Sequence, residues 1–128
     1  MNDESARPAI ILFAHGARDP RWAEPFLRVA ERVRAEAPEA AVELAYLEHL
    51  EPSLEEAARR LALRGAKAIR IVPLFLGRGG HLRIEVPARV AAVAAELPEV
   101  VIEVALPAGD DDAVIDALAQ FCLRAASS

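Results

Sequence analysis

Short apolar runs alternate with helical segments along this chain. Four runs have the length and the Val, Ile and Leu content of β-strands, namely Ala9–Ala14, Ala41–Leu47, Ala68–Leu74 and Val100–Ala105. After each run, apolar residues recur at the 3.6-residue spacing of one helix face. These repeating sets cover residues 26–37, 54–61, 86–97 and 114–122. The alternation predicts a parallel sheet with helices on both of its faces.

Capping residues predict where the helices begin and end. Ser53 and Glu56 match a capping box, in which each side chain satisfies a free backbone amide. Gly65 suits the left-handed position that follows a helix. Pro25 and Pro87 are each expected close to the start of a helix, because a proline in the interior costs about 3 kcal/mol.

The predicted fold is a three-layer αβα domain, whose doubly wound, four-stranded parallel sheet has the strand order 2-1-3-4. The length of 128 residues indicates one domain over residues 1–128, with a disordered N-terminus over residues 1–8. A hydrophobic content of 54% supplies a core and, with 27% charged residues, excludes a disordered chain. The single cysteine, Cys122, lies in the last helical pattern and is expected to be buried.

The net charge of −5 bears on partners and location. Surfaces that bind nucleic acid are basic, so an acidic chain argues against nucleic acid as a partner. The acidic segment Met1–Glu4 is unlike the basic start of a signal peptide, and the first apolar run is too short to span a membrane. A cytoplasmic protein without membrane attachment is therefore expected.

Residues with metal-binding side chains follow three of the predicted strands. His15 follows the first strand, Glu48 the second, and His81 the glycine-rich loop after the third. In a doubly wound sheet, functional groups lie beyond the carboxyl ends of the strands, where the strand order reverses. Because neighbouring strands are about 4.8 Å apart, the three side chains are expected to converge. Two imidazoles and a carboxylate suit a divalent ion such as Co²⁺, Fe²⁺ or Ni²⁺.

Nearby residues offer alternatives. Glu51 competes with Glu48 as the acidic group, whereas His49 is expected to point away from Glu48 toward the surface. The segment Gly77–Gly80 lacks the Lys-Ser/Thr pair of a phosphate-binding loop, so we interpret it as a flexible loop that lets a bulky ligand approach. We interpret Asp110–Asp112 as the cap of the last helix rather than a metal site.

These residues resemble the motifs of a known family. The segments concerned are His15–Pro20 (HGARDP), Tyr46–Glu48, Pro52–Ser53, Val72–Leu76 (VPLFL) and Gly79–His81. In order and spacing they are similar to the CbiX/SirB-type class II tetrapyrrole chelatases, and most similar to the short CbiX form. The resemblance covers nearly the whole chain and implies a chelatase-like half-unit. Ala17 departs from it, because many members carry serine there.

The resemblance implies a metal chelatase of the sirohydrochlorin cobaltochelatase or ferrochelatase type. Such an enzyme inserts a divalent metal, Co²⁺ first and Fe²⁺ or Ni²⁺ as alternatives, into sirohydrochlorin in cobalamin or siroheme biosynthesis, with no ATP and no organic cofactor. His15 and His81 match the two metal-handling histidines of the family, and Glu48 matches an acidic partner. Longer relatives carry two such domains around one cleft, so a single unit is expected to form a homodimer.

Substrate contacts would come from apolar and arginine side chains in the same loops. The flat macrocycle needs an apolar wall, and its carboxylates need cations, which arginine grips bidentately. The candidate substrate-binding residues are Arg18, Arg21, Phe75, Leu76, Arg78, Gly79, Gly80, Leu82 and Arg83. Phe13 is a further candidate for the apolar wall.

Two other classes of function stay open at this point. A chaperone for Co²⁺ or Ni²⁺ would use the same three ligands without turnover. A phosphoryl-transfer enzyme with His15 as nucleophile is a further alternative, although Ala14 stands where histidine phosphatases carry arginine.

Overall fold

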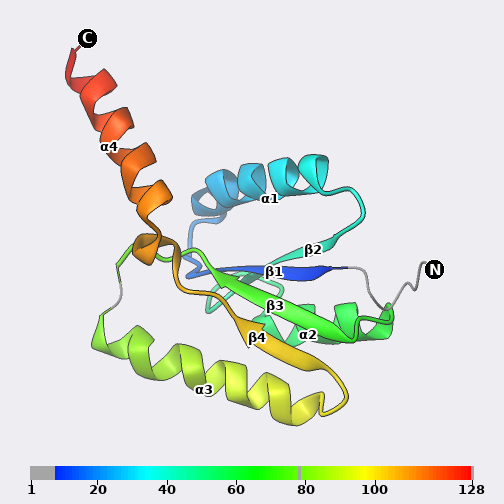
Figure 1. The fold of residues 1–128 in the computed structure, drawn as a ribbon. Helices are drawn as coiled ribbons and strands as arrows, with labels where there is room; N and C mark the ends of the chain where they lie inside the picture. The colour runs from blue at the N-terminus through cyan, green and yellow to red at the C-terminus, as the bar shows by residue number, and fades with distance from the viewer. Residues whose placement is uncertain (1–7, 78, 128) are drawn as a thin grey trace.

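The computed structural model describes residues 8–77 and 79–127, with only the backbone at His81 (Figure 1). Its strands are β1 (Ala9–Ala14), β2 (Ala41–Tyr46), β3 (Ala68–Pro73) and β4 (Val101–Val104). They form one sheet in the order β2-β1-β3-β4, and every pairing is parallel. The predicted strand order is confirmed, and each predicted strand matches the observed one to within one residue at either end.

Helices lie on both faces of this sheet. The helices of the structure are α1 (Glu24–Glu36), α2 (Leu54–Leu63), α3 (Gly80–Glu96) and α4 (Asp112–Ser127), with the 3-10 helices η2 (Pro20–Ala23) and η3 (Ala108–Asp110). Of the four α-helices described, α1, α2 and α3 cover the sheet. One cluster of buried apolar residues joins the sheet to α2 and α3, and a second joins its other face to η2 and α1. The three-layer αβα architecture is therefore confirmed (Figure 1).

The apolar sequence of β1 follows from its central position. Ile11 and Phe13 belong to the cluster with α2 and α3, whereas Leu12 and Ala14 belong to the cluster with α1. Each of these four side chains is buried. A strand covered on both faces has no polar side, which explains why its sequence does not alternate.

The capping predictions for α2 are confirmed. The Ser53 backbone N–H donates to Glu56 Oε1 at 2.9 Å, and the Glu56 backbone N–H donates to Ser53 Oγ at 3.2 Å. Gly65 follows the helix with a φ of +97°. The Ala66 amide then donates to the carbonyl of Leu61 at 3.1 Å, which closes the last turn in the manner of a Schellman motif. Pro25 lies at the start of α1, also as predicted.

The prediction for Pro87 is wrong, because this residue lies inside α3. The helix begins at Gly80 and continues to Glu96. Pro87 has no N–H to donate to the carbonyl of Arg83, so the helix loses one hydrogen bond there. Val86 and Val90, on either side, pack against the core. Burial of these apolar side chains offsets the cost of the proline.

The prediction that Cys122 is buried is also wrong, because the last helix does not pack on the sheet. Figure 1 shows α4 extending away from the sheet, and its main contact is with η3. Leu118 and Phe121 are exposed, and Cys122 is exposed rather than buried. The 3.6-residue pattern reports that a helix has an apolar face but not which surface covers it. The Asp111 carboxylate accepts a hydrogen bond from the Ala113 amide at 3.4 Å, in line with the predicted capping role.

The folded part of the chain includes Pro8, whose carbonyl accepts a hydrogen bond from the Ala41 amide at 2.8 Å. The disorder expected over residues 1–8 therefore does not extend to Pro8, and residues 1–7 lie outside the described residues. Among the helices described, none is long and apolar enough to cross a membrane.

Candidate metal site

The ends of β1 and β2 bring His15 and Glu48 together. Ala14 is paired with Tyr46 in the sheet, and the parallel pairing continues beyond both strands. The Leu47 amide donates to the Ala14 carbonyl at 2.9 Å, and the Glu48 amide donates to the His15 carbonyl at 3.1 Å. His15 Nε2 consequently lies 3.2 Å from Glu48 Oε1. The two side chains are 42% and 47% exposed, so a ligand from solvent can reach both.

Gly16 allows this close approach. Its φ of +94° is in the left-handed region, which side chains with a Cβ rarely adopt. A Cβ at this position would lie 1.8 Å from the backbone oxygen of Glu48. The loop after β1 can therefore turn against Glu48 only if a glycine follows the histidine.

Phe75 packs against the imidazole of His15 and is buried. Its ring lies edge-on to the imidazole of His15, with a centroid distance of 6.3 Å, and also edge-on to Phe13 at 5.8 Å. Phe75 is 6% exposed and Phe13 is fully buried. The expectation that Phe13 forms a substrate-facing wall is therefore wrong, and Phe75 exposes little surface to a substrate. Both rings are instead packed in the apolar core between the sheet and α3.

His49 does not point away from Glu48, contrary to expectation. Its backbone has a φ of +69°, and this turn brings His49 Nε2 to 3.9 Å from Glu48 Oε1. The side chain is exposed, as expected. Simple alternation along a strand does not apply here, because β2 ends at Tyr46 and the chain turns. Glu51 is exposed and makes no hydrogen bond or ion pair within the described part of the chain, so the carboxylate that meets His15 is that of Glu48.

The loop after β3 leads to His81, the third candidate metal ligand. The Leu74 amide, just after β3, donates to the Phe13 carbonyl at 2.8 Å, so the following loop starts beside the end of β1. Gly79 precedes α3, and the backbone of His81 lies in its first turn. The side chain of His81 and the whole of Arg78 lie outside the described residues. Within the part that the structure does describe, no group of three or more His, Cys, Asp or Glu side chains is arranged to hold a metal ion.

The candidate substrate-binding arginines differ in their surroundings. Arg18 and Arg83 are exposed, whereas the guanidinium of Arg21 is bound to Asp19, with Nη2 2.8 Å from Oδ2. These hydrogen bonds lower the pKa of the Asp19 carboxyl. Arg21 would have to leave Asp19 before it could bind another carboxylate.

An apolar cleft of about 180 Å³ lies between α3 and the end of β4. Three of the candidate residues, Phe75, Leu82 and Arg83, line it. Leu76 is 60% exposed, and Gly79 and Gly80 are exposed where the loop enters α3. A larger cleft, of about 620 Å³, lies at the opposite edge of the sheet near Ala9 and Ala41 and contains none of the candidate residues.

These features define a class of protein, the doubly wound α/β domains with an imidazole and a carboxylate at the point where strand order reverses. The family model described as CbiX matches residues 9–125. This match covers most of the chain, and the chain therefore belongs to the CbiX family.

Individual relatives agree with this assignment. The chain is 30% identical over 118 residues to the sirohydrochlorin cobaltochelatase of Sulfolobus acidocaldarius, with 92% of each chain covered. A crystal structure from Marinobacter aquaeolei VT8, which carries the CbiX name and an assignment to cobalamin (vitamin B12) biosynthesis, superposes with a TM-score of 0.82 at 37% identity. That superposition covers 93% of this chain and 97% of the other.

A longer structure is also similar. The sirohydrochlorin chelatase SirB from Bacillus subtilis subspecies spizizenii, in complex with cobalt, superposes with a TM-score of 0.76 at 28% identity. The match covers 89% of this chain but 49% of SirB. The present chain thus corresponds to about half of that protein.

Proposed function

We propose that this protein inserts Co²⁺ into sirohydrochlorin without ATP, as a cytoplasmic homodimer. The observation that carries the proposal is the approach of His15 Nε2 to Glu48 Oε1 at the carboxyl end of a parallel sheet, beside the loop that leads to His81. Membership of the CbiX family supports it, as does the name of the Sulfolobus acidocaldarius relative. In the cytoplasm, the exposed thiol of Cys122 would stay reduced.

Metal and substrate protons exchange places in this reaction. Co²⁺ enters the macrocycle and two pyrrole N–H protons leave it, so the charge is balanced. Neutral imidazoles at His15 and His81 would hold the incoming ion, which is a substrate of the reaction. Glu48 would accept a proton and pass it to solvent, because almost half of its side chain is exposed. Arg18 and Arg83 would bind carboxylates of the substrate, and Leu76 and Leu82 would contact its apolar face.

The homodimer is supported by apolar surface that the single chain leaves uncovered. One side of α4 carries Ile115, Leu118 and Phe121, all exposed. On the sheet, Val101 in β4 is 59% exposed, because α1 contacts β2 rather than β4. Exposed apolar patches of this kind mark surfaces that bind other molecules. A second copy of a half-length chain would also supply the counterpart of the second half of SirB.

Substitution of His15 and His81 provides the test. His15→Ala and His81→Ala should each lower the rate of Co²⁺ insertion by more than about 100-fold, since removal of an outer partner alone costs 10–100-fold. Arg59→Met is the control, because Arg59 pairs with Glu96 and contacts none of the candidate site residues, and it should stay within about threefold of the wild type. The measurement is the absorbance change of sirohydrochlorin with Co²⁺ and protein, compared with Co²⁺ alone.

Two results would count against the proposal. One is a wild-type rate no faster than that of Co²⁺ alone, which would favour a metal-binding protein without turnover. The other is wild-type activity in both His15→Ala and His81→Ala. Repeating the assay with Fe²⁺ and Ni²⁺ ranks the metals.

A further inference from the structure

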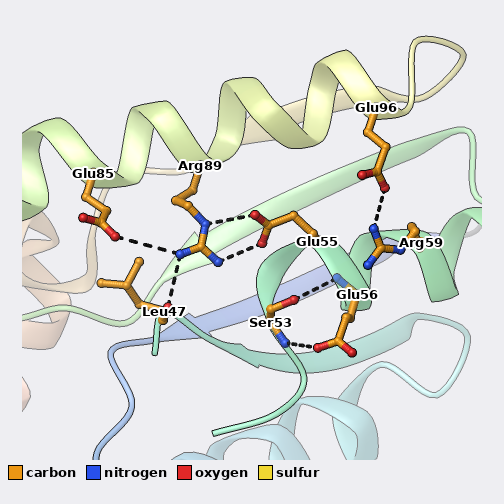
Figure 2. A network of polar contacts seen from close by, with 8 residues as sticks. All are labelled: Leu47, Ser53, Glu55, Glu56, Arg59, Glu85, Arg89 and Glu96. Carbon is orange, nitrogen blue, oxygen red and sulfur yellow. Dashed lines mark hydrogen bonds and ion pairs between the residues drawn. The ribbon is translucent and has the colours of Figure 1, made fainter. Parts of the chain in front are cut away.

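Arg89, in the middle of α3, reaches across to the end of β2 (Figure 2). Its Nε and Nη2 donate to the two carboxylate oxygens of Glu55, in α2, at 3.0 and 2.8 Å. Its Nη1 donates to the backbone carbonyl of Leu47 at 3.2 Å. The side chain is 24% exposed, so water screens these contacts less than it screens a surface ion pair.

The Leu47 carbonyl that Arg89 binds belongs to the peptide group between Leu47 and Glu48. The carbonyl of this peptide accepts from Arg89, and its N–H, on Glu48, donates to the His15 carbonyl at 3.1 Å. One peptide plane is therefore held from two sides, by α3 and by the backbone of His15. Because this plane sets the direction in which the Glu48 side chain leaves the backbone, Arg89 acts on the Glu48 carboxylate through it.

The same arginine belongs to the helix that carries His81. Arg89 lies eight residues after His81, which is about 12 Å along a helix. Any shift of α3 relative to β2 must therefore stretch or break the contacts of Arg89. The hydrogen bonds from Arg89 also lower the pKa of the Glu55 carboxyl, so that this anchor is ionised at neutral pH.

A second ion pair between α2 and α3 provides a comparison for the backbone contact of Arg89. Arg59, in α2, binds Glu96 at the far end of α3, with 2.8 Å between Nη1 and Oε2 (Figure 2). Both side chains of this pair are more exposed than Arg89. Arg59 and Arg89 thus tie the same two helices together, but only Arg89 bonds to the backbone next to Glu48.

We propose that Arg89 is a positioning residue for metal insertion, which holds the Leu47–Glu48 peptide against α3 and so sets the spacing between the His15–Glu48 pair and His81. The inference rests on the proposed function and assigns to Arg89 no contact with metal or tetrapyrrole.

The experiment compares Arg89→Met with Arg59→Met. In Arg89→Met, kcat for Co²⁺ insertion should fall by about 10–100-fold, as for the loss of an outer partner of a metal ligand, while KM for sirohydrochlorin stays within about twofold. Binding of Co²⁺ alone, measured by titration calorimetry, should weaken by a similar factor. Arg59→Met, the matched control, should keep wild-type values for all three quantities.

A double variant separates positioning from stability. Arg89→Met leaves the Glu55 carboxylate half-buried without this partner, which can destabilise the fold. Glu55→Leu with Arg89→Met replaces the Glu55–Arg89 pair by apolar groups and can restore stability. Both variants lose the longer contact of Arg89 with Glu85, at 3.9 Å, so this contact does not distinguish them. The double variant should therefore regain the wild-type Tm but not the wild-type kcat or Co²⁺ affinity.

The outcomes are distinct. If Arg89→Met matches Arg59→Met in kcat and Co²⁺ affinity, or if the double variant regains full kcat together with its Tm, Arg89 has no positioning role. If the wild type itself does not accelerate insertion over Co²⁺ alone, the proposed function fails instead, and the calorimetry still reports whether Arg89 shapes the metal site.

Discussion

At the scale of single residues, the candidate site depends on the space that Gly16 leaves next to Glu48. Gly16 and Gly65 both have a φ in the left-handed region. They differ in their surroundings, because a Cβ at Gly16 would collide with the Glu48 backbone, whereas a Cβ at Gly65 has open space around it. The two glycines thus allow backbone strain and loss of the site to be measured separately.

Gly16→Ala should weaken Co²⁺ binding and lower the insertion rate by at least about 10-fold, because the loop must move away from Glu48 and take His15 with it. Gly65→Ala carries only the strain of the backbone, about 1–2 kcal/mol, and should keep wild-type activity. Calorimetry with Co²⁺ and urea denaturation check the two effects. Equal losses of activity in both variants would show that the close approach at Gly16 does not matter.

At the scale of elements, local sequence signals predict α2 correctly but predict the start of α3 wrongly. The capping box of α2 involves residues three apart in the chain, and it forms as the sequence predicts. In α3, Pro87 is tolerated inside the helix because the helix is retained by packing rather than by local preference. In α3, burial of apolar side chains therefore overrides the helix-breaking preference of Pro87. In α2, the packing agrees with the capping box.

Pro87→Ala should stabilise the protein. An interior proline costs a helix about 3 kcal/mol, and the stiffness that it gives the unfolded chain returns up to about 1 kcal/mol. The free energy of unfolding should thus rise by roughly 2 kcal/mol in urea denaturation. Pro25→Ala is the control, because a proline at the start of a helix removes no hydrogen bond. An unchanged or lower stability in Pro87→Ala would contradict this account of α3.

At the scale of the whole molecule, α4 is the helix that does not pack against the sheet. It extends from the body of the domain with its apolar side exposed (Figure 1). Solvent exposure of such a face is unfavourable, at about 25 cal/mol per Å² of apolar surface. Pairing of two copies through this surface, as in the proposed homodimer, would remove that cost.

Leu118→Glu should convert a dimer to a monomer, because a carboxylate cannot be buried in an apolar interface without a partner. Gln120→Glu adds the same charge on the opposite side of α4 and should leave the dimer intact. Light scattering coupled to gel filtration measures the mass of each variant. A wild-type protein that is monomeric at all concentrations would refute the homodimer.

Much of the architecture was determined by the sequence alone. The four apolar runs and the helical periods between them predicted the layers and the strand order, because these signals arise from neighbours in the chain. The same reasoning predicted that His15 and Glu48 meet, since parallel strands end at one edge. The wider role of these residues in metal insertion stays a prediction.

Only the tertiary structure decided how the site is built. The turn of His49, the burial of Phe75, the position of α4 and the contact of Arg89 with Leu47 each depend on how elements pack in three dimensions. Arg89 and Leu47 are 42 positions apart, and no period of 2 or 3.6 residues relates them. Local patterns predict which residues face inward, whereas the distances between distant side chains follow from the packing of the complete domain.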